Sequence, residues 1–372
     1  MIGDFGARNL DHHERTFAKR DDEDLKQLRQ SRATIERLAR DTLKNAAIAV
    51  EEHKVLVLVD LQGIYLNLHE WLRERRFPID DGLLLSRFAF FGFQDVFDAM
   101  KAEVLNEGAG RLLDFEDLLS QIEDGKSGVK IPTGASYVRF VPQFEVFYAP
   151  APLEDIEWQL RRYAMSGSFE ARQQLDAVRD GIVKKVGWFD RDYAAYDDFV
   201  AKLKANPEYS KATKGFFSLS VGPRGLQYFD EKAVDTSIVI RAMDALYDYE
   251  ADSLCVVSSD QDFVPLKARA ESFGVQYYQA DLAKFDASHR VGRALKNFGP
   301  RFIRGRFSPE WPSRVIIEAV SNSDFGVQQM YKLSEQELSA LCELHNSMND
   351  FHISLEYLGD DAASLKITKP EK

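Results

Sequence analysis

The chain has 372 residues, of which 45% are hydrophobic and 12% are aromatic. This length corresponds to about two average domains, and the apolar content is enough for a folded core, which excludes a disordered chain. Its 48 basic and 60 acidic side chains give a net charge of −12, which excludes non-specific coating of nucleic acid or membrane.

The cysteine content and the lack of long apolar segments indicate the cellular compartment. Two cysteines are too few for a disulfide framework and favour a reducing compartment. The first residues contain no apolar segment typical of a signal peptide, and no apolar run reaches the roughly 20 residues of a membrane helix. We therefore expect a soluble, cytoplasmic protein with no membrane partner.

The composition divides the chain into three predicted parts. Residues 1–53 are rich in helix-forming side chains and predict a helical extension, which either packs on the main domain or forms a homodimer. Residues 54–306 are the predicted main domain, with a long insertion within about 71–229. Residues 307–372 carry 11 acids against 5 bases and predict a small α+β region.

Continuous apolar runs predict buried strands of the kind found in parallel sheets. The first, at 55–59, ends in Asp60, and the second, at 253–257, is followed by SSDQDF. A helix over 263–273, closed by a glycine, and a strand at 275–278 complete a βαβ unit. The predicted fold class is α/β, with a mostly parallel central sheet.

Acidic side chains stand at the predicted ends of these strands, where ligands of open α/β sheets bind. Asp60 follows the first strand, and Asp260 and Asp262 follow the second. Asp260 and Asp262 are two residues apart, so in extended backbone they would project to the same side. Asp235 opens a predicted helix that leads into the second strand. Converging carboxylates repel one another unless a hard cation such as Mg²⁺ or Mn²⁺ neutralises them.

A purely structural explanation of these acids stays open, because aspartate is a favoured helix N-cap. Asp235, Asp260 and Asp262 could each simply begin a helix. Asp60 is harder to explain in this way, since it closes an all-apolar strand. Together the four acids favour a metal site in which the ion activates water and stabilises a phosphoryl transition state.

The segment CVVSSDQDFVPLKARAESFGVQYY resembles the strand, S-G-D-x-D-F-x-P-L, helix and strand of NYN domains, which are PIN-like nucleases. EKAVD is similar to the E-K-x-V-D element of the family, and VLVLVDLQG to its first strand ending in D-G-x-N. The resemblance implies a PIN-like α/β/α sandwich with metal-dependent ribonuclease activity, and Ser258 and Ser259 beside the metal ligands. The residues that it implies as metal ligands and catalytic groups are Asp60, Asp235, Asp260 and Asp262.

The sequence departs from the family pattern at several positions. Leu61 and Gly63 replace the glycine and asparagine of D-G-x-N, and Ser259 replaces the glycine of S-G-D. Arg241 stands where the family often has a further acid. These changes leave two hypotheses open: a nuclease of divergent specificity, or a catalytically inactive NYN-like module that binds RNA or a protein partner.

A basic segment is the expected contact for a substrate. Residues 289–306 contain six cations and no acid, with phenylalanines nearby. Such a pattern is typical of binding to single-stranded nucleic acid, so we expect RNA as the partner. The alternative is a solvated helix and an arginine-rich turn that pairs with the acidic tail. The candidate RNA-binding residues are Lys232, Arg241, Arg290, Arg293, Lys296, Arg301, Arg304 and Arg306.

The sequence as a whole predicts a Mg²⁺- or Mn²⁺-dependent endoribonuclease. Other kinds of site lack support, because Gly125-Lys126-Ser127 has neither the earlier glycine nor the preceding strand of a P-loop. No histidines and cysteines have zinc-site spacing. A phosphatase on a similar sheet is a third hypothesis, which predicts turnover of a small phosphate ester and indifference to polynucleotide.

Overall fold

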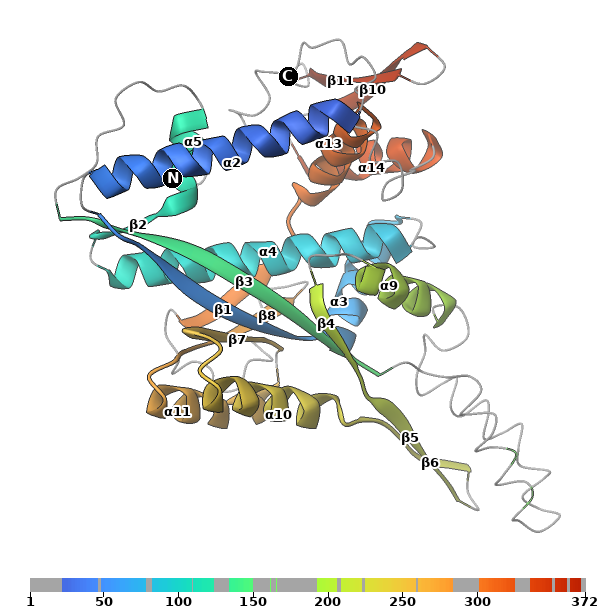
Figure 1. The fold of residues 1–372 in the computed structure, drawn as a ribbon. Helices are drawn as coiled ribbons and strands as arrows, with labels where there is room; N and C mark the ends of the chain where they lie inside the picture. The colour runs from blue at the N-terminus through green and yellow to red at the C-terminus, as the bar shows by residue number, and fades with distance from the viewer. Residues whose placement is uncertain are drawn as a thin grey trace.

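A computed structural model describes most of the chain. Its central feature is a parallel sheet with helices on both faces (Figure 1). The described residues are 22–45, 48–77, 82–108, 110–123, 134–149, 161, 165, 193–205, 209–222, 225–258, 260–283, 301–324, 335–349, 352–359 and 362–368.

The central sheet has the strand order β2-β3-β1-β7-β8-β9, and β4 pairs with the second half of β3. Every neighbouring pair in this sheet is parallel. The predicted α/β fold class is therefore confirmed. The strands are β1 (Val50–Asp60), β2 (Leu112–Asp114), β3 (Ser136–Tyr148), β4 (Tyr209–Lys214), β7 (Ser253–Val257), β8 (Gln276–Ala283) and β9 (Phe302–Arg306).

Strand β1 shows why a continuous apolar run suits the middle of this sheet. Val55, Val57 and Val59 point into the larger core on one face, and Leu56 and Leu58 point into the core on the other. All five are at most 2% exposed. Because side chains alternate between the faces of a strand, a strand covered on both faces needs apolar residues at every position.

Helices form the two outer layers (Figure 1). Trp71 and Phe88 belong to the larger core, and Ile238 and Leu266 belong to the core on the opposite face. No helix of the described chain is long and apolar enough to span a membrane. The helices of the main domain that line the larger core are α3 (Leu61–Glu74), α4 (Gly82–Glu107) and α9 (Tyr193–Ala205), and those of the opposite face are α10 (Val234–Tyr247) and α11 (Pro265–Ser272).

The N-terminal helix α2 (Asp22–Asn45) packs within the protein. Its buried residues Ala39 and Leu43 share a small core with α5 (Phe115–Glu123) and with Tyr137 of β3. This packing agrees with the first of the two explanations for the helix. A homodimer through α2 stays a prediction.

Much of the expected insertion is part of the central sheet, because β2, β3 and β4 all lie within residues 71–229. Two further strands, β5 (Phe216–Gly222) and β6 (Gly225–Lys232), form an antiparallel hairpin. This hairpin projects from the body of the molecule and leads directly into α10 (Figure 1).

The C-terminal region packs against the main domain. Trp311 is fully buried in the same core as α4, and its Nε1 donates a hydrogen bond to Asp95 at 2.8 Å. Arg314 donates to the other oxygen of Asp95 at 2.9 Å. The elements of this region are α13 (Trp311–Asp324), α14 (Glu335–Met348) and an antiparallel hairpin of β10 (His352–Gly359) and β11 (Ala362–Thr368).

Candidate functional site

The ends of β1 and β7 bring two predicted site residues together. Val59 pairs with Val257, so Asp60 and Ser258 are the next residues on neighbouring strands. The Ser258 hydroxyl donates a hydrogen bond to Asp60 Oδ2 at 3.0 Å and accepts one from the backbone N–H of Asp260 at 3.1 Å. The nearly buried Ser258 side chain therefore connects the Asp60 carboxylate to the segment that carries Asp260.

The segment after β7, comprising Ser258 and Asp260–Phe263 of the described residues, is called the acid loop. The prediction that Asp260 and Asp262 project to the same side from extended backbone is wrong. Residues Gln261–Phe263 form a 3₁₀ turn, and Asp260 Oδ1 accepts a hydrogen bond from the backbone N–H of Asp262 at 2.9 Å. Asp260 is thus the N-cap of this turn, while both side chains stay exposed.

Asp235 lies in the first turn of α10, close enough for its charge to act on Asp60. The N-cap of this helix is Ala233, which has a left-handed backbone and offers no side-chain cap, so Asp235 is not the capping residue. Close packing fixes the start of the helix. A Cβ atom on Gly215 would lie 2.7 Å from the carbonyl oxygen of Lys232 and from a methyl group of Val234. Lys232 therefore lies at the base of the β5–β6 hairpin, next to this helix start.

The charges of two neighbouring acids act on Asp60. Burial, followed by the negative charges of Asp235 and Asp260, raises the pKa of Asp60 to about 6, while the Ser258 hydrogen bond opposes the shift. The groups near Asp60 that act on its charge therefore include two further carboxylates. This is the accumulation of negative charge that a bound cation would relieve.

The arrangement fits a hard divalent ion that shares few protein ligands. Among the described residues, no three His, Cys, Asp or Glu side chains lie close enough to form a complete metal site. Mg²⁺ commonly binds through one or two carboxylates and keeps several waters, so Asp60 and a neighbouring acid are sufficient. A closed cage of protein ligands is not needed.

Strand β8 contributes two residues that sequence reasoning missed. Asp281 is 4% exposed and lies near the carboxyl end of β8. Gln279, two residues earlier and so on the same face of the strand, donates hydrogen bonds to the acid loop. The sequence prediction ended this strand at 278, whereas it continues to Ala283. With the longer strand, the rule that found Asp60 would also have found Asp281.

Arg241 is committed to ion pairs within the protein. Its Nε lies 2.9 Å from Glu145 Oε1, and its guanidinium also lies 2.6 Å from Glu250. The Arg241 side chain is 13% exposed and Glu145 is buried in β3. Glu145 thus neutralises the cation and ties α10 to the sheet, and the structure gives no support for the predicted RNA contact.

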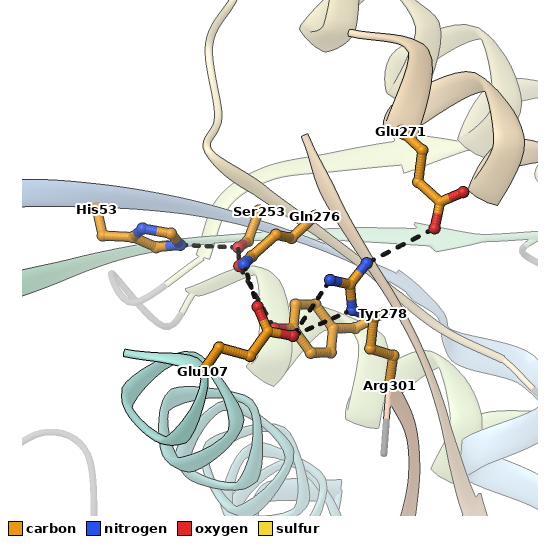
Figure 2. A network of polar contacts seen from close by, with 7 residues as sticks. All are labelled: His53, Glu107, Ser253, Glu271, Gln276, Tyr278 and Arg301. Carbon is orange, nitrogen blue, oxygen red and sulfur yellow. Dashed lines mark hydrogen bonds and ion pairs between the residues drawn. The ribbon is translucent and has the colours of Figure 1, made fainter. Parts of the chain in front are cut away.

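Arg301 lies at the opposite end of the sheet from Asp60. It precedes β9, near the amino ends of β7 and β8, where its guanidinium contacts Glu107 at 3.1 Å and Glu271 at 3.6 Å (Figure 2). Arg301 therefore pairs with two acids of the main domain rather than with the acidic tail, and it does not reach the candidate site.

The other predicted contacts are only partly described. In β9, Arg304 pairs in register with Asp281, and Arg306 pairs with Ala283, so their backbones lie toward the carboxyl end of the sheet. The predicted residues that lie outside the described part of the chain are Ser259, Arg290, Arg293 and Lys296.

Part of the chain matches a known protein family. Residues 187–303 match the family model of the NYN domain. The predicted resemblance to NYN domains is confirmed for this part of the chain. This match contains Asp235, Ser258, Asp260 and Asp262 and begins after β1, so the sheet joins Asp60 to it. The NYN domain indicates a nuclease-like function of the PIN type.

A solved structure is also similar. It is a protein of unknown function from Vibrio parahaemolyticus, at 11% identity and a TM-score of 0.28, with 68% of this chain and 92% of that chain covered. No curated protein matches the sequence.

Proposed function

We propose that this protein is a divalent-metal-dependent endoribonuclease that hydrolyses phosphodiester bonds of RNA at the carboxyl end of β1 and β7. One observation carries the proposal. Asp60 is partly buried at a strand end, is hydrogen-bonded by Ser258 and is close enough to Asp235 and Asp260 that their charges add to the effect of burial, which together raise its pKa to about 6. Titratable groups shifted by burial and by like charges are typical of functional sites.

In this proposal Asp60, Asp235 and Asp260 hold Mg²⁺ or Mn²⁺, one or two of them directly and the rest through waters that the ion keeps, and Asp262 holds the ion or orients the attacking water. When bound, the ion supplies an activated water and stabilises negative charge on the phosphoryl group. The protein supplies orientation. Ser258 donates to Asp60 Oδ2, and the backbone of Gln62 also hydrogen-bonds the Asp60 carboxylate. Asp260 stays exposed at the head of the acid loop.

The proposed RNA contacts lie around this edge of the sheet. Lys232 lies at the base of the hairpin beside α10, and Arg304 and Arg306 lie on β9. Lysine and arginine bind phosphates without reading sequence, which suits a single strand held along a cationic path. Arg290, Arg293 and Lys296 belong to the same proposal through their place in the sequence.

A second candidate function is an NYN-like module that binds RNA without cutting it. It is favoured by the incomplete set of acids, since within the described residues no three such ligands converge. Arg241 also favours a module that does not cut RNA, because it stands where the family often has a further acid and pairs with Glu145.

The test is cleavage of labelled unstructured RNA, with DNA of matching sequence alongside, in chelator, Mg²⁺ and Mn²⁺. Asp260→Asn is the diagnostic variant, because asparagine also caps helical turns and should preserve the acid loop. Asp244→Asn is the matched control, since Asp244 is an exposed acid on the same helix as Asp235. A small phosphate ester, assayed in parallel, detects a phosphatase.

The proposal expects metal-dependent cutting of RNA that Asp260→Asn abolishes and Asp244→Asn retains. Equal cutting by both variants would contradict the assignment of Asp260 to the metal site. RNA that binds without metal and stays intact after metal is added would favour the non-cleaving module. Turnover confined to the small ester would favour the phosphatase.

A further inference from the structure

Strand β8 presents two buried polar side chains to the acid loop. Gln279 is fully buried, and its Nε2 amide donates to the carbonyl of Ser258 at 3.0 Å and to the carbonyl of Asp260 at 2.6 Å. The hydroxyl of Tyr277, which is also fully buried, lies 3.2 Å from the carbonyl of Phe263 and 3.3 Å from Gln279 Oε1. One amide thus holds the start of the loop, and Tyr277 holds its end.

Both N–H donors of the Gln279 amide are used within the candidate site. A glutamine amide has two N–H donors, and both are directed at backbone carbonyls that belong to site residues. The same two residues provide the hydroxyl that donates to Asp60 and the N–H that binds this hydroxyl. The orientation of Asp60 relative to Asp260 therefore depends on peptide groups that Gln279 fixes.

We propose that Gln279 is a positioning residue, which sets the geometry of Asp60 and Asp260 for the metal ion without touching the ion or the substrate. This inference rests on the proposed function of the site. Groups that orient metal ligands through hydrogen bonds commonly change metal affinity or activity about 10- to 100-fold when they are replaced. A planar amide that binds two carbonyls cannot be replaced by an apolar side chain of similar size.

The same strand offers a matched control at its other end. Gln276 Nε2 donates to Glu107 at 2.7 Å, and Gln276 Oε1 accepts from Ser253 at 3.2 Å and lies 3.4 Å from the Tyr278 hydroxyl (Figure 2). Both glutamines therefore lose several hydrogen bonds when they are changed to methionine. Of the two, Gln279 alone contacts the acid loop.

The experiment compares the wild type with Gln279→Met and Gln276→Met. RNA cleavage is measured over a range of Mn²⁺ concentrations, and the Mn²⁺ affinity of each protein is measured by calorimetry without RNA. Thermal unfolding gives the folded fraction by which each rate is normalised. We expect Gln279→Met to need about 10- to 100-fold more Mn²⁺ for half-maximal cleavage, and Gln276→Met to behave as the wild type. Tyr277→Phe, which removes one hydroxyl and keeps the ring, should shift the Mn²⁺ dependence in the same direction by less.

Unchanged Mn²⁺ dependence in Gln279→Met would overturn the inference, and so would an equal shift in Gln276→Met. If Gln279→Met does not fold, an unshifted Tyr277→Phe overturns it. Wild-type protein that does not cleave RNA contradicts the proposed function alone, and Mn²⁺ affinity from calorimetry then decides the role of Gln279. Wild-type protein that neither cleaves RNA nor binds Mn²⁺ overturns both.

Discussion

The two ends of the central sheet differ in the surroundings of their acidic side chains. At the amino ends of β7 and β8, Glu107 accepts hydrogen bonds from Gln276 and Arg301, and Arg301 also contacts Glu271 (Figure 2). At the carboxyl ends, Asp60 is partly buried beside two further acids, and its pKa is raised to about 6. Glu107 thus has a cationic partner at one end, whereas Asp60 lies beside carboxylates of its own sign at the other.

This difference separates a structural network from a candidate functional one. Paired and hydrogen-bonded charges at the amino end satisfy one another. A partly buried carboxylate next to like charges costs folding free energy, so its presence at a strand end calls for a functional reason. A divalent cation is the partner that would compensate this cost.

The largest expected effect is the loss of RNA cleavage in Asp60→Asn, with Glu107→Gln at the other end of the sheet as the control. Asp60→Asn should reduce RNA cleavage by about 100-fold or more, because it weakens binding of the ion and alters the group that Ser258 orients. Glu107→Gln should leave the normalised rate unchanged. Initial rates on labelled RNA at saturating Mn²⁺ measure both, and a comparable loss in the two variants would remove the distinction between the ends.

The same substitution, Asp60→Asn, should raise the stability of the fold although it lowers activity. Because the pKa of Asp60 is higher in the folded than in the unfolded protein, its stabilising contribution is complete at low pH and is lost as pH rises through about 6. In chelator at about pH 7.5, Asp60→Asn should therefore be more stable than the wild type by about 2 kcal/mol. Urea unfolding between about pH 4 and pH 8 measures this, and a constant difference across that range would refute the assignment.

At the amino end, loss of a pair should destabilise the fold. Glu107→Gln removes the charge that Arg301 faces and one acceptor of the network, which should cost about 1 kcal/mol, since the pair is partly exposed to solvent. Urea unfolding at low and high salt provides the measurement. A variant as stable as the wild type would mean that solvent already screens this network fully.

Effects on stability of similar or smaller size concern a glycine near each end. A Cβ atom added to Gly63, in the first turn of α3, would meet nothing within 4 Å, so Gly63→Ala should add about 0.5–1 kcal/mol of stability. Gly274, after α11, has φ of +75°, so Gly274→Ala should remove about 1 kcal/mol. Thermal unfolding of the two variants should show melting temperatures displaced in opposite directions, and a shared direction would contradict the backbone argument.

The fold was readable from the sequence where a local pattern determines it. The apolar run of β1 and the glycine after α11 identified a buried strand and a helix end, and the acids at strand ends identified the edge where Asp60, Ser258 and Asp260 meet. Long-range pairing was not readable. The ion pair of Arg241 with Glu145 joins residues 96 positions apart, and no local pattern encodes it.

Other errors came from element boundaries and turn chemistry. The carboxyl end of β8 was placed too early, which hid Asp281 and Gln279. The capping bond from the Asp262 N–H to Asp260 bends the chain into a 3₁₀ turn, where alternation in an extended strand was expected. Both errors affect the site, where short polar segments and not apolar periodicity determine the conformation.

The most direct test of the central claim is whether Mn²⁺ stabilises the folded protein through the carboxyl end of the sheet. Thermal unfolding of metal-free wild type, Asp60→Asn and Glu107→Gln would be recorded over increasing Mn²⁺, since an ion that binds the native state at about 100 times its Kd adds about 2.7 kcal/mol. The account predicts a rising melting temperature for the wild type and Glu107→Gln, with little change for Asp60→Asn. No response in the wild type, or an equal response in Asp60→Asn, would contradict it.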